Sequence, residues 1–136
     1  MTRPPTTAEG SAYDLYSRGR GLLEAGHPHQ AATLLSRAKA LEPGKASIRE
    51  ALARALYQSG WMARARREFA KAVDLDPVND YAHFGLGLSC ARTGQHRRAV
   101  AHLKLAVAMR PERDEYRDAL LRLTSRERGQ AEPPAR

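Results

Sequence analysis

Apolar residues recur along the chain in short stripes with the helical spacing of three or four positions. In the middle of the chain one stripe contains Leu52 and Leu56, and the next contains Ala65, Phe69 and Ala72. This spacing places the apolar side chains on one face of an amphipathic helix. The pattern therefore predicts two consecutive helices that pack against each other through these faces.

The pair of stripes occurs three times, at a period of 34 residues. The segments 12–45, 46–79 and 80–113 align without a gap, which indicates one structural unit written three times. The same residue types then fall at equivalent places, which are Gly19, Ala53 and Gly87; Gly26, Gly60 and Gly94; Ala31, Ala65 and Ala99; Leu35, Phe69 and Leu103; Ala38, Ala72 and Ala106; and Pro43, Pro77 and Pro111.

Each class of repeated residue has a physical role in a helix–turn–helix unit. A glycine between the stripes, such as Gly60, can take a positive φ angle and end the first helix. Small residues such as Gly19 let two helices approach closely, and large ones such as Phe69 fill the space between them. Proline cannot continue a helix, so Pro77 fixes the bend into the next unit. Pro28 falls at the expected start of a helix, where proline is tolerated.

A 34-residue helix–turn–helix period with these positions resembles the tetratricopeptide repeat family over about residues 12–113. The resemblance implies an all-α fold, a right-handed α-solenoid of antiparallel helix pairs with seven helices. The solenoid is expected over 11–128, and its seventh helix, at about 113–128, is expected to cap the last repeat. Leu121 supports a cap, because this bulky residue occupies the small-residue place and no second helix follows it. Residues 1–10 and 129–136 are predicted to be disordered tails.

The resemblance also implies that a partner binds on the concave side, which the first helix of each repeat lines. Aromatic residues concentrate on the corresponding stripe of this sequence, and arginines recur along it. Exposed aromatic rings anchor binding partners, and arginine suits carboxylates. The predicted groove residues are Tyr13, Tyr16, Arg20, Arg54, Tyr57, Tyr81, Phe84, Leu88, Arg92 and Arg122.

The groove residues predict a non-catalytic adaptor that binds a peptide or helix of another protein, with apolar side chains and some acidic residues. We expect that replacing Tyr16, Tyr81 and Phe84 with alanine abolishes binding and leaves melting nearly unchanged. The alternative that some rings pack internally, and that Arg20 and Arg54 form ion pairs within their own helices, stays open.

Some family members clamp a peptide carboxylate with lysines, asparagines and an arginine. In this sequence the matching places are occupied by Tyr16, Arg20, Ala51, Tyr81 and Gly85. Only Arg20 is cationic, so a clamp of that type is not expected here.

The charge balance leaves two further functions open. The net charge is +8, with 23 Lys and Arg against 15 Asp and Glu, which favours acidic partners and attracts nucleic acid non-specifically. The runs 64–71 and 96–98 place cations on the predicted convex side. We expect this side to be a solvated outer face, and the alternative is that it forms a ridge that contacts phosphates. These runs lack the aromatic interleaving of single-strand binders. Nucleic-acid association through this basic surface is one alternative function, and self-assembly through the groove or cap is the other.

The remaining residues indicate neither catalysis nor a cofactor. The sequence lacks the common catalytic, phosphate-binding and metal motifs, and the histidines of "HPH" (27–29) have no carboxylate or cysteine beside them. The single cysteine, Cys90, lies in an apolar pattern and is predicted to be a core residue in a reducing compartment. Because long apolar runs and a signal-peptide pattern are absent from the sequence, we expect a soluble, cytoplasmic protein that does not engage membranes.

Overall fold

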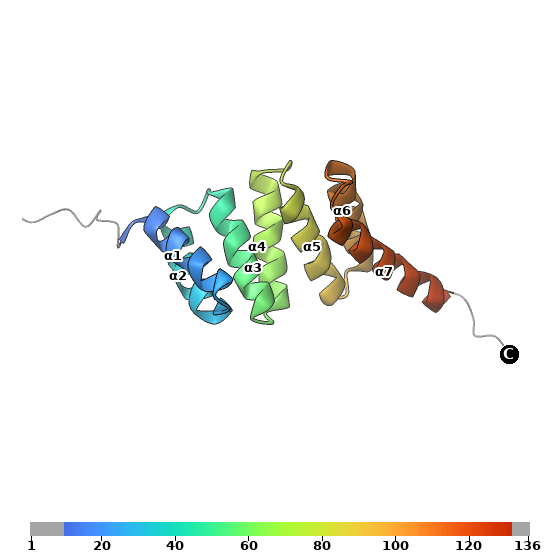
Figure 1. The fold of residues 1–136 in the computed structure, drawn as a ribbon, viewed down its shortest axis with the longest axis horizontal. Coiled ribbons are helices and arrows are strands. Elements are labelled where there is room, and N and C mark those ends of the chain that lie inside the picture. The colour runs from blue at the N-terminus through green and yellow to red at the C-terminus, as the bar shows by residue number, and fades with distance from the viewer. Residues whose placement is uncertain (1–9, 132–136) are drawn as a thin grey trace, which may run out of the picture.

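A computed structural model describes residues 10–131, and over this range the chain is an all-α solenoid of three helix pairs and a seventh helix (Figure 1). The fold class and the number of helices predicted from the sequence are confirmed for the described residues. The first helices of successive units begin 34 residues apart, as the sequence period requires. The helices are α1 (Ala12–Glu24), α2 (Pro28–Leu41), α3 (Ala46–Gln58), α4 (Met62–Leu75), α5 (Asp80–Arg92), α6 (His96–Met109) and α7 (Asp114–Ala131).

The first helix of each pair ends at a glycine in the left-handed region. Gly26, Gly60 and Gly94 have φ angles of 87°, 87° and 79°. The residue after each glycine donates its backbone N–H to a carbonyl five positions earlier, which satisfies an acceptor at the helix end. These bonds run from His27 to Leu22 (2.8 Å), from Trp61 to Leu56 (2.9 Å) and from Gln95 to Cys90 (2.8 Å).

Prolines mark both ends of second helices. Pro28 is the first residue of α2, where a missing N–H costs nothing. The helices α2, α4 and α6 end two residues before Pro43, Pro77 and Pro111. Each pair therefore turns into the next at the same place, which gives the regular stacking.

Small residues bring the helices of a pair together. A methyl group added to Gly19 would lie 2.6 Å from Cγ of Leu35, and one added to Gly87 would lie 2.8 Å from Cγ of Leu103. Both leucines are buried, so they cannot move away. The predicted fit of small residues against large ones is confirmed in the first and third repeats.

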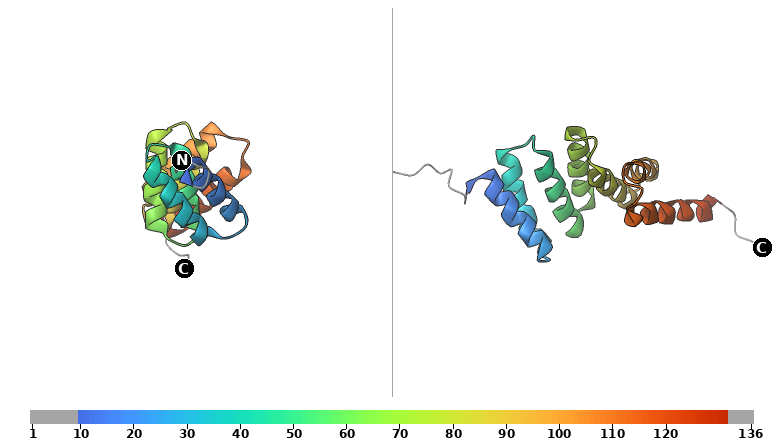
Figure 2. Two further views of the ribbon diagram at one scale, coloured as in Figure 1. Left: turned by 90° about the vertical axis from the view of Figure 1, so that its left-hand side faces the viewer. Right: turned by 45° about the horizontal axis from the view of Figure 1, so that its top comes forward.

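The two sides of the solenoid differ in how adjacent repeats meet. The first helices contact one another in the order α1, α3, α5 and α7. Among the described helices, the backbones of α2 and α4, and of α4 and α6, do not come close, although the Lys39 and Glu68 side chains join α2 to α4. The row of first helices is therefore the tighter, concave side, and the second helices spread apart on the convex side (Figures 1 and 2).

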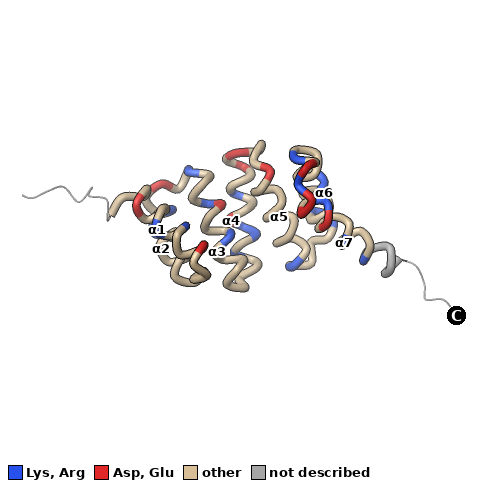
Figure 3. The backbone as a smooth tube through the Cα atoms, in the orientation of Figure 1, with Lys and Arg blue, Asp and Glu red and all other residues tan. Residues whose placement is uncertain are grey.

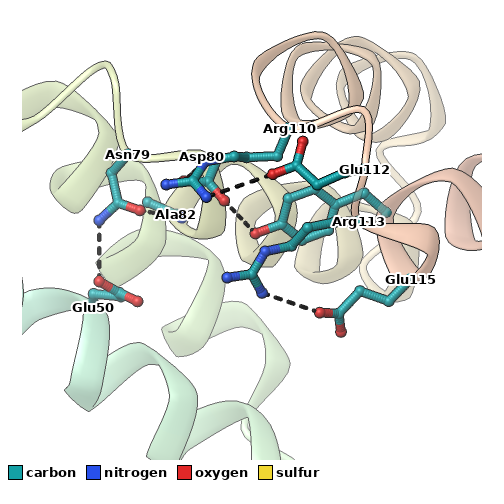
Figure 4. Close-up of polar contacts among 9 residues, drawn as sticks. Glu50, Asn79, Asp80, Ala82, Arg110, Glu112, Arg113 and Glu115 are labelled. Carbon is teal, nitrogen blue, oxygen red and sulfur yellow. Dashed lines mark hydrogen bonds and ion pairs between the residues drawn. The ribbon is translucent and has the colours of Figure 1, made fainter.

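The seventh helix closes the last repeat. The Tyr116 side chain is fully buried, and its hydroxyl donates a 2.5 Å hydrogen bond to Asp80 at the start of α5. Arg110 approaches the same carboxylate at 3.8 Å (Figure 4). Leu121 is 53% exposed, as expected of a helix on which no further helix packs.

The ends of the chain are only partly described. The helix α7 continues to Ala131, three residues past the expected end of the cap, so the predicted tail 129–136 begins inside it. Residues 1–9 and 132–136, which cover most of the two predicted tails, lie outside the described residues.

Candidate protein-binding groove

Three adjoining hollows run along the first helices from α1 to α7 and together form one groove. Arg54 belongs to the first and second hollows, and Tyr57 and Leu88 belong to the second and third, so the three are continuous. The first is lined by Tyr16, Arg20, Ser47, Glu50, Ala51 and Arg54. The second is lined by Arg54, Tyr57, Gln58, Phe69, Tyr81, Gly85 and Leu88. The third is lined by Tyr57, Leu88, Ala91, Arg92, Leu103, Ala119, Arg122, Leu123 and Arg126.

Arginine side chains lie over aromatic rings along the groove. A guanidinium in this position is attracted to the negative face of the ring. Two of the three pairs join first helices of different repeats, and the other lies within α1. The pairs, with the distance from the guanidinium carbon to the ring centre, are Arg20 and Tyr16 (5.7 Å), Arg54 and Tyr81 (5.7 Å), and Arg92 and Tyr57 (6.0 Å).

Arg54 is the half-buried cation at the middle of the groove. Its Nε is buried and has no hydrogen-bond partner among the described residues. Burial raises the pKa of Tyr81, against the opposing effect of the Arg54 charge. The hydroxyl of Tyr81 is therefore neutral at physiological pH, and Arg54 is the cation that lies over its ring.

The carboxylates of the groove are engaged to different degrees. Glu50, one turn before Arg54, accepts a 3.0 Å hydrogen bond from Asn79 across the repeat boundary (Figure 4). Arg20 lies 3.8 Å from Glu24 in the same helix, and both side chains are exposed. The ion pair that the sequence allowed within α1 is therefore present, but it is weak in solvent.

Phe84 corrects the predicted site, because its ring is 8% exposed. It lies 4.6 Å from the ring of Tyr116 and 5.9 Å from that of Tyr81, measured between ring centres. The prediction that Phe84 is an exposed anchor in the groove is wrong, since α7 covers it. Tyr13 is 77% exposed, but it lines none of the three hollows.

The other eight predicted residues, which are Tyr16, Arg20, Arg54, Tyr57, Tyr81, Leu88, Arg92 and Arg122, all line the groove. Sequence reasoning missed the apolar floor of the third hollow, formed by Leu103, Ala119 and Leu123. Leu123 is half-buried, so part of its side chain is open to this hollow.

Two other sequence predictions concern residues of α5. Cys90 is fully buried in the core, as predicted, and burial raises the pKa of its thiol. His83 is 5% exposed, with Nε2 2.8 Å from the Pro77 carbonyl and Nδ1 3.1 Å from Nδ1 of His102. Both ring nitrogens of His83 therefore have polar partners inside the protein.

The basic convex run is only partly free. Arg64, Arg67 and Lys71 are exposed, as expected of an outer face. Arg66 instead donates a 2.9 Å hydrogen bond to Thr93 of the next repeat. The carboxylate oxygens of Glu68 accept hydrogen bonds from Lys39 Nζ at 2.7 Å and from Arg49 Nη1 at 3.0 Å, which ties the first two repeats together.

Membrane-spanning helices and clusters of metal-binding side chains are absent from the part of the chain that the structure describes. None of the described helices is both long enough and apolar enough to cross a membrane. In residues 10–131, no three His, Cys, Asp or Glu side chains come together in a group that could hold a metal ion.

Comparison with known proteins agrees with this geometry. Residues 16–80 and 51–114 each match the family model described as tetratricopeptide repeat. The chain belongs to the tetratricopeptide repeat (TPR) family. The TPR repeat-containing protein PA4299 of Pseudomonas aeruginosa is 33% identical over 101 residues, which cover 74% of this chain. The chain spans only 39% of the length of that relative.

Solved TPR structures share the fold at low sequence identity. The Sgt2 TPR domain from Aspergillus fumigatus has a TM-score of 0.83 at 20% identity, covering 98% of this chain and 93% of that domain. The first TPR of Spaghetti (RPAP3), bound to HSP90 peptide SRMEEVD, has a TM-score of 0.80 at 16% identity, covering 85% and 91%. YrrB, a TPR protein with an unusual peptide-binding site, has a TM-score of 0.74 at 23% identity, covering 80% and 56%. TPR domains of this shape therefore include peptide binders.

Proposed function

We propose that this protein is a non-catalytic adaptor that binds a segment of another protein in the groove. The observation that carries the proposal is the continuous row of hollows in which arginines and half-buried aromatic rings alternate along four helices. Rings fixed by packing on one side and open on the other bind with little loss of conformational entropy. The peptide-bound TPR structures support a protein partner in general.

The groove changes in character along its length, and this sets the chemistry of the partner. The first hollow is mostly polar, with Arg20 and Arg54 beside Ser47. The third has an apolar floor with arginines at its edge, among them Arg92 and Arg122. We propose that the partner places an apolar side chain on this floor and acidic side chains against Arg54, Arg92 and Arg122.

A carboxylate-clamp mode of binding is not proposed. Ala51 and Gly85, which stand at two of the clamp places, are both buried and carry no polar side chain.

Selection from a displayed library of random short peptides tests the proposal. We expect the selected peptides to be enriched in acidic and apolar residues. The triple variant Arg54→Gln, Arg92→Gln, Arg122→Gln should bind them at least about tenfold more weakly, since a hydrogen bond to a charged group contributes about 1.5–3 kcal/mol. Fluorescence anisotropy of a labelled peptide measures the affinity.

The matched control removes the same charge from the convex side. The variant Arg67→Gln, Lys71→Gln, Arg97→Gln loses three exposed cations and should keep the affinity of the wild type within about twofold at physiological salt. Equal weakening of both variants would show that net charge, and not the groove, drives binding. Selection of peptides without acidic residues would contradict the proposed partner.

A further inference from the structure

A second hollow with a different chemistry lies on the convex side, between α2 and the turn that joins α3 to α4. It has a volume of about 550 Å³, which is in the range of small-ligand sites. It lies between α2 and α4, two outer helices whose backbones do not come close and which are joined farther along by the Lys39–Glu68 ion pair. Its lining residues are His29, Ala32, Thr33, Ser36, Arg37, Leu56, Ser59, Trp61 and Arg64.

The repeat itself shows why this hollow exists. Ala32 and Ser59 occupy the places that Arg66 and Thr93 occupy one repeat later, 34 residues on. At that later boundary the Arg66 side chain reaches across and donates a 2.9 Å hydrogen bond to Thr93 Oγ1. At the earlier boundary Ala32 is too short to do the same. The space that Arg66 fills in one boundary is left open in the other.

The shorter residue also leaves a polar atom without a partner. Oγ of Ser59 is buried and makes no hydrogen bond to any described residue. A buried hydroxyl without a partner costs free energy, and a ligand that bonds to it recovers that cost. The unpartnered hydroxyl is therefore an independent sign that the hollow accepts a polar group.

The electrostatics of the hollow favour an anion. Arg37 and Arg64 line it, His29 lies beside them, and no acidic residue is part of the lining. Figure 3 shows acidic residues gathered at the upper ends of α4 and α5, next to the turn between those repeats. The turn 59–61 lies at the opposite end of α4 (Figure 1). The exposed cations Arg67 and Lys71 follow on the same helix.

Trp61 adds a flat stacking surface at the edge of the hollow. Its side chain is 49% exposed, and the guanidinium of Arg64 lies 4.9 Å from the ring centre. The guanidinium lies over one face of the indole, and nucleobases stack both on aromatic rings and on arginine guanidinium planes. The basic runs of the sequence lack interleaved aromatic residues, but the turn 59–61 places the ring of Trp61 beside them.

We propose that the convex hollow under Trp61 binds a nucleotide, either free or within a single strand. The base stacks on Trp61, and its polar edge bonds with the hydroxyls of Ser59 and Ser36. The phosphate pairs with Arg64 or Arg37. This site is separate from the groove and does not depend on the proposed function of the groove.

The chain contains one tryptophan, so its fluorescence reports directly on this hollow. Three probes distinguish the possible ligands: uridine monophosphate, a fluorescein-labelled short oligouridylate, and an oligoglutamate peptide of similar length. We expect the oligouridylate to quench Trp61 and to bind more weakly as salt increases, because phosphate contacts release counterions. Quenching by the mononucleotide as well would assign the site to free nucleotides, and quenching by the strand alone would assign it to single strands.

The variant Ala32→Arg provides a specific block, because it introduces the residue that fills the equivalent space between the second and third repeats. It adds positive charge, yet it should weaken oligouridylate binding about tenfold, the loss expected for one stacked base. The change Trp61→Leu, read by anisotropy of the labelled strand, should cause a similar loss without altering the fold. The groove variant Arg122→Gln should leave this affinity unchanged.

Several outcomes would overturn the proposal. Absence of quenching at low salt would show that no nucleotide enters the hollow. Strand binding that neither Ala32→Arg nor Trp61→Leu weakens would show attraction by the surface cations alone. Equal quenching by oligoglutamate, blocked by Ala32→Arg, would show that the hollow binds an acidic peptide instead.

Discussion

The guanidinium carbon of Arg54 lies 5.7 Å from the centre of the Tyr81 ring. This contact links the first helices of the second and third repeats. The contact orients both side chains toward the groove. Tyr81 stays half-buried because Arg54 of the preceding repeat covers one part of it. Tyr13 occupies the same place in the first repeat, where no earlier described helix lies beside it, and it is 77% exposed. Position in the stack therefore decides how a residue at one repeat place behaves.

The burial of Phe84 changes the result expected from alanine substitution in the groove. Phe84→Ala should destabilise the protein by about 3–5 kcal/mol, since it removes a buried ring that packs on Tyr116. Tyr13→Ala should change the stability by less than about 0.5 kcal/mol, because its ring is exposed. Urea denaturation followed by circular dichroism measures both. A small effect of Phe84→Ala would restore the ring to the list of candidate binding residues.

Two glycines within helices should respond in opposite directions to alanine. A methyl group at Gly85 would collide with the ring of the buried Phe69, so Gly85→Ala should destabilise by about 1–3 kcal/mol. Gly21 has no neighbouring atom within 4 Å of the added methyl group, so Gly21→Ala should stabilise by about 0.5–1 kcal/mol through helix propensity. Thermal melting of the two variants gives the comparison. Stabilisation by both would mean that the second and third repeats are not closely packed there.

The hydrogen bond from Tyr116 to Asp80 should anchor the capping helix. Burial and the neighbouring Asp80 carboxylate raise the pKa of the Tyr116 hydroxyl well above its usual value, so it stays a donor at all ordinary pH values. Tyr116→Phe should cost about 1–3 kcal/mol, because it leaves the acceptor without this donor (Figure 4).

Hydrogen exchange of α7 amides locates the effect of Tyr116→Phe. Faster exchange confined to α7 is the expected result. Unchanged exchange in α7, with loss of protection spread over the first repeat, would contradict an anchoring role. Arg117→Ala provides the comparison, since its side chain is exposed and donates only to Asp114 and to the Pro111 carbonyl just before α7, without reaching α5.

The stability should fall in mildly acidic solution because of His102. Burial lowers the pKa of His102, and the nearby His83 and the charge of Arg98 act in the same direction. The unfolded chain, with a histidine pKa of about 6.5, therefore binds a proton at a higher pH than the folded chain does. Stability should decrease as the pH falls through about 6.5 and continue to decrease down to the pKa of the folded state.

Urea midpoints measured across this pH range test the role of His102. His102→Gln should reduce the pH dependence, and a glutamine can still donate to Nδ1 of His83. That acceptor is free for a donor because His83 Nε2 must carry the proton given to the Pro77 carbonyl. The exposed His29 provides the control, since His29→Gln should leave the pH dependence unchanged. An equal pH dependence in all three proteins would assign the effect to other groups.

The sequence predicted the repeat and its turns because each depends on residues close together in the chain. Gly60 and Pro77 mark the ends of α3 and α4 through local backbone geometry. The burial of Phe84 could not be predicted in this way, because it depends on Tyr116 from another helix. The third hollow likewise needs α5, α6 and α7 together.

The hollow under Trp61 was missed for a different reason. The signal was present in the aligned repeats, as the contrast between Ala32 and Arg66, but its meaning requires knowing that Arg66 reaches Thr93. The short side chain of Ala32 indicates a cavity only once the structure shows that Arg66, at the same place in the second repeat, reaches into the third repeat.

The wide spacing of the outer helices has a mechanical consequence, because the backbones of α2 and α4, and of α4 and α6, do not come close. When the solenoid bends about its row of first helices, few atoms of the outer helices are pressed together. Its curvature can therefore change at low energetic cost. The first helices then form the axis about which the solenoid bends. A bound segment that widens or narrows the groove can thereby alter the spacing of the outer helices. Binding on the concave side would then change the shape of the convex side.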